Sequence, residues 1–316
     1  MPWTSCLGRS SVPVLLYHQI GQLGSGGVAR QDFIAQMRWL AEAGVHSLTP
    51  ADLARVLTGE PLDRPAVLIT FDDGFRDLYT SIGPLLAELD FSATVFLINS
   101  RIRPENEPGQ EGEIVSDKAH LGFVLDKDRS PWLSDKEIRE LMDSGVLDIG
   151  SHSFSHEQGP VSPPTLAQVP DHWSYARYTR PMRDNPGEKA CLLKPELAQP
   201  LYLAEEGGHE SQAQYRARVL ENLCASKADL EARFGVPVTS LAWPWGEFSA
   251  TAMDAAREAG LNLLFTLERG PVCAGTDPAR LPRLEVRSRK GMGWFTNRIF
   301  LYSRALTARL YSAMRV

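Results

Sequence analysis

Short apolar runs alternate along the chain with segments whose apolar residues recur at helical spacing. The runs predict seven buried strands, at 12–18, 65–71, 92–98, 146–152, 237–244, 261–267 and 281–286. Helical spacing and capping residues predict helices at about 32–44, 49–57, 76–89, 134–145, 211–234 and 249–259. Repeated strand–helix units indicate an α/β protein whose parallel sheet is covered by helices. In such folds the functional residues lie at the carboxyl ends of the strands.

Two segments depart from this alternation. Residues 157–210 contain eight of the 22 prolines and the mixed stretch "WSYARYTRPMRDN", which predicts an irregular insertion on the functional face. We expect it either to fold over a substrate or to be a surface loop without a role. From about 292 to 316, apolar residues at helical spacing among four arginines and no acid predict an amphipathic helix. This helix either packs on the barrel or makes a peripheral membrane contact.

The composition is that of an ordinary globular protein, and it is useful mainly because it argues against certain kinds of function. The chain has 316 residues, of which 43% are hydrophobic and 23% charged, so it can bury a core. The formal charge of −6 argues against a nucleic-acid partner. The four cysteines form no C-x-x-C pair, which argues against a thiolate zinc site. No signal peptide or membrane-spanning stretch is visible, so the sequence as it stands predicts a cytoplasmic or peripheral membrane protein and leaves the compartment open.

Two neighbouring carboxylates, Asp72 and Asp73, follow the apolar run "VLITF". Like charges this close repel each other, so a nearby cation or a role in proton transfer is expected. His152 and His156 follow a later strand, and in a helical turn this spacing places both imidazoles on one side, as a divalent cation requires. We therefore predict that one aspartate and both histidines bind a cation, while the other aspartate is a general base. The alternatives are a helix N-cap or an Asx-turn at the aspartates, and structural roles for the histidines.

The motifs "TFDDG" and "SHSFSH" resemble the first two motifs of the polysaccharide deacetylases of carbohydrate esterase family 4, the NodB-type domain. The resemblance runs from about "PVLLYH" to "RLEV". The stretches "LAWPWGEFSATAMDAAREAGLNLLFTLERG" and "SQAQYRARVLENLCASKADLEARFG" look most like the branch that acts on poly-β-1,6-N-acetylglucosamine of biofilm matrices. The resemblance implies a distorted (β/α) barrel of about seven parallel strands. Residues 1–316 would then form a single domain that carries the insertion and the C-terminal helix.

The resemblance also implies the chemistry, which is hydrolytic N-deacetylation of a polysaccharide containing N-acetylhexosamine, with release of acetate. Asp72 occupies the position of the catalytic base. The implied metal ligands are Asp73, His152 and His156. They imply one divalent ion, zinc in the first place, with nickel, cobalt or iron as alternatives. The implied residues of the substrate groove are Trp243, Pro244, Trp245 and Gly246. From the insertion, Trp173 and Tyr175 are expected to stack on sugar rings.

Three departures from the family's pattern concern the base and the proton donor. Trp243 stands where many members have an arginine that positions the base. "FTLERG" replaces an Asp-Asp-Trp-like motif, and "RLPRLEV" lacks the histidine that supplies a general acid in many members. We therefore predict that His18, at the end of the first strand, is the acid, with an orienting role toward Asp72 or a ligand as the alternative. The alternative functions are a glycan-binding module without catalysis and a deacetylase of another glycan or of a small amide.

Overall fold

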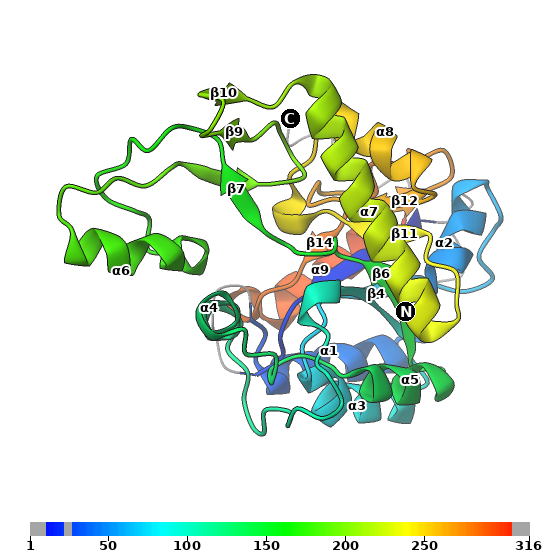
Figure 1. The fold of residues 1–316 in the computed structure, drawn as a ribbon. Helices are drawn as coiled ribbons and strands as arrows, with labels where there is room; N and C mark the ends of the chain where they lie inside the picture. Colours follow the sequence, from blue (N-terminus) through cyan, green and yellow to red (C-terminus); the bar gives the residue numbers. More distant parts are fainter. Residues whose placement is uncertain (1–10, 22–26, 305–316) are drawn as a thin grey trace.

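Seven parallel strands form a curved sheet, a half-barrel, at the centre of the protein (Figure 1). The computed structural model describes residues 11–21 and 27–304. Across the sheet the strands follow the order β12 (Leu263–Phe265), β11 (Ser240–Ala242), β6 (Leu147–Ser151), β5 (Ala93–Leu97), β4 (Ala66–Asp73), β2 (Val14–Tyr17) and β14 (Leu284–Glu285). The short strand β3 (His46–Ser47) also pairs with the beginning of β4. This topology confirms the predicted distorted barrel.

Helices connect the strands and surround the half-barrel (Figure 1). They are α1 (Arg30–Glu42), α2 (Pro50–Leu57), α3 (Gly83–Glu88), α4 (Ser116–Asp126), α5 (Asp135–Asp143), α7 (Gln212–Phe234), α8 (Ala250–Glu258) and α9 (Gly291–Tyr302). Capping boxes begin α2, α5 and α7, and Gly235, with φ of 70°, ends α7. Helix α4 has no counterpart in the sequence-based prediction, because its N-cap, Val115, offers no capping side chain to mark where the helix begins.

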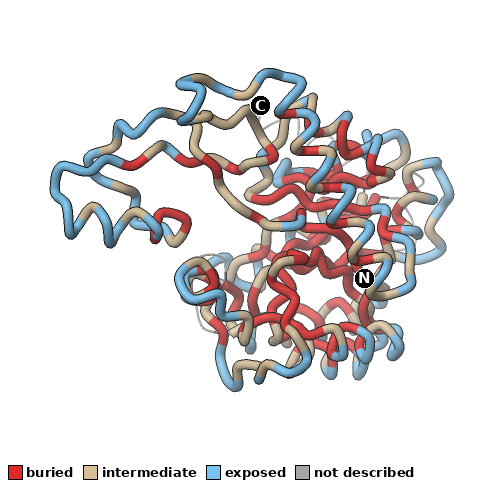
Figure 2. Tube along the Cα trace, in the orientation of Figure 1, coloured by how far each residue is buried: buried red, intermediate tan, exposed pale blue. Residues whose placement is uncertain are grey.

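The strands β4 and β5 lie in the core of the protein, and every residue of both is buried (Figure 2). Both read as nearly continuous apolar runs, as expected for parallel strands covered on both faces. Beside them, the rings of Tyr17, Phe33 and Phe71 pack with centroids 5.2 to 5.9 Å apart. The hydroxyl of Tyr17 donates a hydrogen bond of 2.7 Å to Gln36. This packing holds the carboxyl ends of β2 and β4 against α1, beside the candidate site.

Residues 157–210, called the arm below, extend away from the half-barrel and are largely exposed (Figures 1 and 2). The arm is less irregular than predicted, because it contains two short antiparallel ladders and two helical segments. The ladders pair β7 (Gln158–Pro160) with β8 (Leu193–Pro195) and β9 (Tyr202–Leu203) with β10 (Gly208–His209). The helical segments are the 3₁₀ turn η3 (Trp173–Tyr175) and α6 (Ala176–Asp184). Both pack against α4, so the tip of the arm returns to the barrel.

The C-terminal helix α9 packs against α1, as the first of the two alternatives predicts. Its residues Phe295, Ile299 and Tyr302 are buried, and Phe295 meets Trp39 edge to face at 6.1 Å. The remainder of the helix predicted to reach 316 lies outside the described residues. At the other end of the chain, β1 (Ser11–Val12) pairs with β13 (Val272–Cys273). Among residues 11–21 and 27–304, no helix has the length and apolar character needed to cross a membrane.

Candidate metal centre and active site

Both carboxylates of the Asp72–Asp73 pair line one pocket, although neighbouring residues in a strand ordinarily face opposite sides of the sheet. The backbone explains this arrangement. Asp73 has φ of 73° and Gly74 has φ of 75°, so the chain leaves the extended conformation at the second aspartate. A Cβ atom at position 74 would lie 2.8 Å from Cδ2 of Leu97, so a larger residue would have to displace the end of that side chain as well as adopt a positive φ. Both aspartates are almost fully buried.

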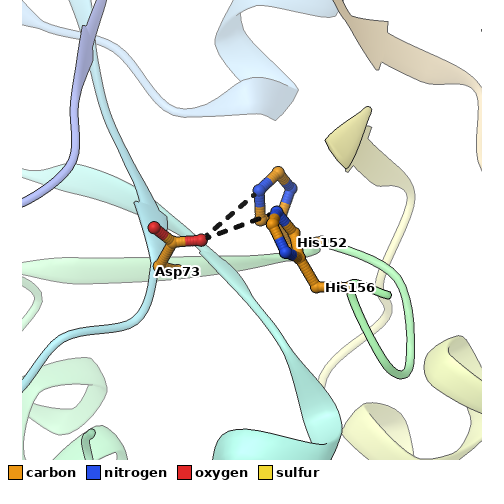
Figure 3. A group of neighbouring side chains, drawn as sticks. All are labelled: Asp73, His152 and His156. Carbon is orange, nitrogen blue, oxygen red and sulfur yellow. Dashed lines mark ion pairs between the residues drawn. The ribbon is translucent and has the colours of Figure 1, made fainter. Parts of the chain in front are cut away.

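His152 and His156 lie in a loop after β6, and not in the helical turn that their spacing predicts. Ser153 and His156 have φ of 67° and 51°, which no α-helix accommodates. Serine hydroxyls take the place of helical hydrogen bonds. Ser151 accepts from the amide of Ser153 at 3.1 Å, and Ser153 accepts from the amide of His156 at 2.9 Å. The loop still brings both imidazoles to the same side, facing Asp73 (Figure 3).

The side chains of Asp73, His152 and His156 form a set that could hold a metal ion (Figure 3). Oδ1 of Asp73 lies 3.7 Å from Nε2 of His152 and 3.8 Å from Nε2 of His156. Ligands held about 2.0–2.2 Å from one ion are separated by roughly 3–4 Å, so these distances fit. His152 donates from Nδ1 to the carbonyl oxygen of Ala242 at 2.8 Å. In the neutral ring this leaves the lone pair of Nε2 facing the cluster, as a ligand requires.

The electrostatics of the cluster favour the protonation states of metal ligands. Burial alone would raise the pKa of Asp73, but His120 and His156 outweigh it and hold the pKa well below its ordinary value. Burial and the neighbouring His152 lower the pKa of His156 well below its ordinary value. At neutral pH the aspartate is therefore ionised and His156 is neutral, which a divalent cation requires. The donor set of one carboxylate and two imidazoles suits zinc and related ions.

Asp72 is held by Arg283, which the sequence analysis did not identify as a site residue. Nη1 of Arg283 donates to Oδ1 of Asp72 at 2.7 Å, and Nη2 donates to Oδ2 at 2.9 Å. Both side chains are almost completely buried. Burial alone would raise the pKa of Asp72, but Arg283 and then His152 outweigh it and lower the pKa below its ordinary value. The carboxylate is therefore ionised at neutral pH and fixed in orientation.

Arg283 also resolves one of the departures found in the sequence. It precedes β14, in the stretch "RLPRLEV", which the sequence analysis examined only for a missing histidine. A charged residue directly before a buried strand needs a partner of opposite charge, and this signal in the sequence could have identified Arg283. Arg283 thus reaches Asp72 from the segment before β14, whereas the family's pattern has an arginine where Trp243 stands.

These side chains line a pocket of about 240 Å³ at the carboxyl ends of the strands. Of the residues predicted from the sequence, it brings together His18, Asp72, Asp73, His152, His156, Trp173, Trp243, Trp245 and Gly246. Pro244 and Tyr175 are both buried, and neither lines the pocket. The hydroxyl of Tyr175 accepts a hydrogen bond from the amide of Leu193 at 2.8 Å, so this ring packs within the arm and is not part of the pocket lining. Trp173, its neighbour in the arm, does reach the pocket.

Comparison with known proteins places the chain in a family. The model of the polysaccharide deacetylase family matches residues 59–264, which contain the aspartate pair and the histidine loop. The chain belongs to the polysaccharide deacetylase family. It is 22% identical over 266 residues to the poly-beta-1,6-N-acetyl-D-glucosamine N-deacetylase of Escherichia coli K12, which is 84% of this chain and 34% of that protein. This chain therefore spans about a third of the length of that relative.

Solved structures of deacetylases share the fold of this family member. A de-N-acetylase from Aggregatibacter actinomycetemcomitans superposes with a TM-score of 0.70 at 20% identity, over 91% of this chain and 99% of that chain. The deacetylase domain of BpsB from Bordetella bronchiseptica gives a TM-score of 0.65 at 22% identity, over 88% and 96% of the two chains. At this identity the likeness establishes the fold, and the activity must be argued from the residues of the site.

Proposed function

We propose that this chain is a metal-dependent N-deacetylase that hydrolyses the acetamido groups of a glycan containing N-acetylhexosamine. The observation that supports this most directly is the Asp72 carboxylate, which Arg283 keeps ionised beside the cluster of three metal-ligand side chains. A buried, oriented carboxylate next to such a cluster is the arrangement of a general base in metal-assisted hydrolysis. Relatives named as poly-beta-1,6-N-acetyl-D-glucosamine N-deacetylases support the substrate class.

Asp73, His152 and His156 would hold the divalent cation, with zinc as the first candidate and nickel, cobalt and iron as the others. When bound there, such an ion acts as a Lewis acid on the acetyl carbonyl and makes water more acidic. Asp72 accepts the proton from the water that attacks the amide carbon. The carbon–nitrogen bond then breaks, and the products are acetate and the free amine of the sugar.

The departing amine needs a proton, and His18 is the residue we propose to supply it. His18 follows β2, is partly exposed, and lines the same pocket as Asp72 and Asp73. His18→Ala is expected to lower turnover on an N-acetyl sugar much more than turnover on an activated acetyl ester, whose leaving group needs no proton. The two rates are compared with the same enzyme preparation. Equal losses on both substrates would assign His18 to orienting its neighbours.

His120 on α4 is a second residue that the sequence analysis missed, and we propose that it positions Asp73. An arginine is always protonated, so Arg101 donates to Nδ1 of His120 and makes this nitrogen an acceptor. The remaining Nε2–H then points at Oδ2 of Asp73, at 3.4 Å. Oδ2 is thereby engaged, and Oδ1 is left for the side where the two ligand histidines lie.

Two substitutions separate this hydrogen bond from mere packing. His120→Gln retains an N–H donor in nearly the same place, so the affinity for zinc is expected to stay within about threefold of the original. His120→Leu removes the donor and is expected to weaken zinc binding by about 10- to 100-fold. The affinity is measured by competition with a chelating dye. If the two variants bind zinc equally poorly, His120 contributes by its stacking on Trp173, where the ring centroids are 4.5 Å apart.

Tryptophan rings around the cluster provide surfaces for a sugar. The ring centroids of Trp245 and His156 are 4.0 Å apart. Those of Trp173 and Trp245 are 5.9 Å apart, with an angle of 25° between the two ring planes. Trp173 comes from the arm, so the arm contributes one wall of the pocket. We propose that this wall binds the glycan, which gives the arm a role in substrate affinity.

Acetate release from defined oligomers tests the proposed function. We expect release from β-1,6-linked N-acetylglucosamine oligomers, at a higher kcat/KM than from β-1,4-linked oligomers of the same length or from a monomeric acetamide. Equal rates on both linkages would still support deacetylase activity but would contradict the expected preference for β-1,6-linked substrates. Binding of the oligomers without any acetate release would contradict the proposal and favour a glycan-binding module.

A further inference from the structure

A second cavity, of about 380 Å³, adjoins the pocket of the proposed active site. The two share the side chains of His156 and Trp173. The other walls of the second cavity come from α4 and its C-cap, from the 3₁₀ turn η2 (Asn99–Arg101), and from the arm, both at its beginning and at η3 and α6. A glycan with one unit in the active-site pocket therefore has space beside Trp173 for a neighbouring unit.

This cavity is positively charged, although the chain as a whole carries a formal charge of −6. Three cationic side chains line it, those of Arg101, Lys127 and Arg177. Glu157 is the one carboxylate among its lining residues, and it forms no ion pair with any of the three among the described residues. Three cations against one anion give the space an excess of positive charge.

Arg101 distinguishes this cavity from an ordinary basic surface. Its side chain is 1% exposed, and within residues 11–21 and 27–304 no carboxylate lies within ion-pair distance of it, although Asp73 and Glu157 act on its charge from farther away. Other buried arginines do have one, since Arg103 pairs with Glu137 at 2.9 Å and Arg283 with its aspartate at 2.7 Å. Nε of Arg101 has no hydrogen-bond partner in the described part of the chain. A buried cation whose carboxylates lie beyond ion-pair distance is only partly compensated, and an anion in the cavity would add to that compensation.

The aromatic rings around Arg101 compensate its charge only in part. Its guanidinium carbon lies 4.3 Å from the centroid of Phe123 and 5.7 Å from that of Trp173. Such contacts stabilise a cation but offer no acceptor for the unpaired N–H. Burial lowers the pKa of Arg101 to about 10, so the side chain remains charged at neutral pH. The cavity thus combines an incompletely compensated charge with an aromatic wall of the kind that binds sugars.

We infer that this second cavity, called the anion subsite here, binds a negatively charged group on the sugar unit next to the one that is deacetylated. The inference rests on the proposed deacetylase function and specifies its substrate. The anionic group is a carboxylate or a phosphate ester, either of which accepts hydrogen bonds from a guanidinium fork. Lys127 and Arg177, both exposed at the mouth of the cavity, add attraction over a longer range.

Binding and turnover of three N-acetylglucosamine oligomers of equal length test the anion subsite. One oligomer is neutral, one alternates with glucuronic acid, and one carries a phosphate ester on the neighbouring unit. We expect the wild-type protein to bind one or both anionic oligomers about tenfold more tightly than the neutral one in calorimetry at low salt. Comparison of the carboxylate and the phosphate identifies the source of the charge.

A double variant and a matched control connect the preference to the cavity. Lys127→Gln with Arg177→Gln is expected to remove most of the anionic preference. The control is Lys136→Gln with Arg180→Gln, which removes the same number of charges from exposed positions outside the cavity lining and should retain the preference. Equal loss in both double variants would overturn the subsite, because net charge alone would then account for the preference.

The remaining outcomes separate the subsite from the proposed function. Release of acetate from the neutral oligomer, with no tighter binding of either anionic one, would overturn the anion subsite and leave the deacetylase intact. Tighter binding of an anionic oligomer by the wild-type protein but not by the cavity variant, without acetate release from any substrate, would support the subsite and overturn the deacetylase.

Discussion

Asp72→Asn is expected to lower the turnover of an N-acetylated oligomer by about 10²- to 10⁴-fold, while zinc binds as tightly as in the wild type. An amide cannot accept the proton of the attacking water, whereas the three ligand side chains are untouched. Asp73→Asn is the matched comparison, because it changes the adjacent residue in the same way but removes a ligand charge. Asp73→Asn should weaken zinc binding, and turnover should fall because less of the protein then holds zinc.

Two measurements on both variants decide between the roles of the aspartates. Single-turnover acetate release at saturating zinc reports the base, and competition with a chelating dye reports the ligand. Loss of zinc affinity in Asp72→Asn together with retained affinity in Asp73→Asn would exchange the two roles. A retained rate in both variants would remove both aspartates from the chemistry.

Arg283→Met is expected to lower the free energy of unfolding by about 3–5 kcal/mol, since it leaves the Asp72 carboxylate buried without its partner. Arg280→Met, which removes an exposed arginine three positions earlier, should change it little. Stability is measured by urea unfolding at neutral pH. The double variant Asp72→Asn with Arg283→Met should recover part of the loss, because no uncompensated charge remains. Additive losses in the double variant would contradict the coupling of the two side chains.

Arg283→Met should also change how the activity and the stability of the protein depend on pH. The folded-state pKa of Asp72 lies below its ordinary value of 3.8, so its interaction with Arg283 stabilises the fold above that pH. This contribution is lost only as the pH falls through the folded-state pKa. Without Arg283 the main influence that lowers the pKa of Asp72 is lost, so the pKa should rise and the acidic limb of the pH–rate profile should move to higher pH. An unchanged limb in Arg283→Met would show that Asp72 is not the base.

The strands and the aspartate pair are predictable from the sequence because their signals are local. The part of β4 before Asp72 is apolar except for Thr70, and such a nearly continuous apolar run indicates a strand buried on both faces. Parallel strands then place all their carboxyl ends at one edge, which brings His18 and His152 to the aspartates. The spacing of His152 and His156 predicts that the two imidazoles face one side, as they do, but predicts the wrong backbone, since serine hydroxyls stabilise a loop with positive φ angles.

Arg283 and His120 escape prediction because their roles depend on contacts distant in sequence. Arg283 is 211 positions from Asp72, and His120 is 47 positions from Asp73. No periodicity links such pairs, and only the closing of the barrel and the packing of α4 bring them together. The different positions of Trp173 and Tyr175 also depend on a contact distant in sequence. Leu193 in β8 of the arm donates a hydrogen bond to the hydroxyl of Tyr175, and Trp173 is the ring that lines the pocket.

Acetate release by one preparation in three states tests the central claim most directly. The protein is assayed as purified, after removal of metal with a chelator, and after the return of one equivalent of zinc, with a β-1,6-linked N-acetylglucosamine oligomer as substrate. We predict that the chelated protein loses at least about 100-fold in rate and that one equivalent of zinc restores it, with one free amine formed for each acetate. An undiminished rate in the fully chelated protein, or no acetate in any state, would contradict the account.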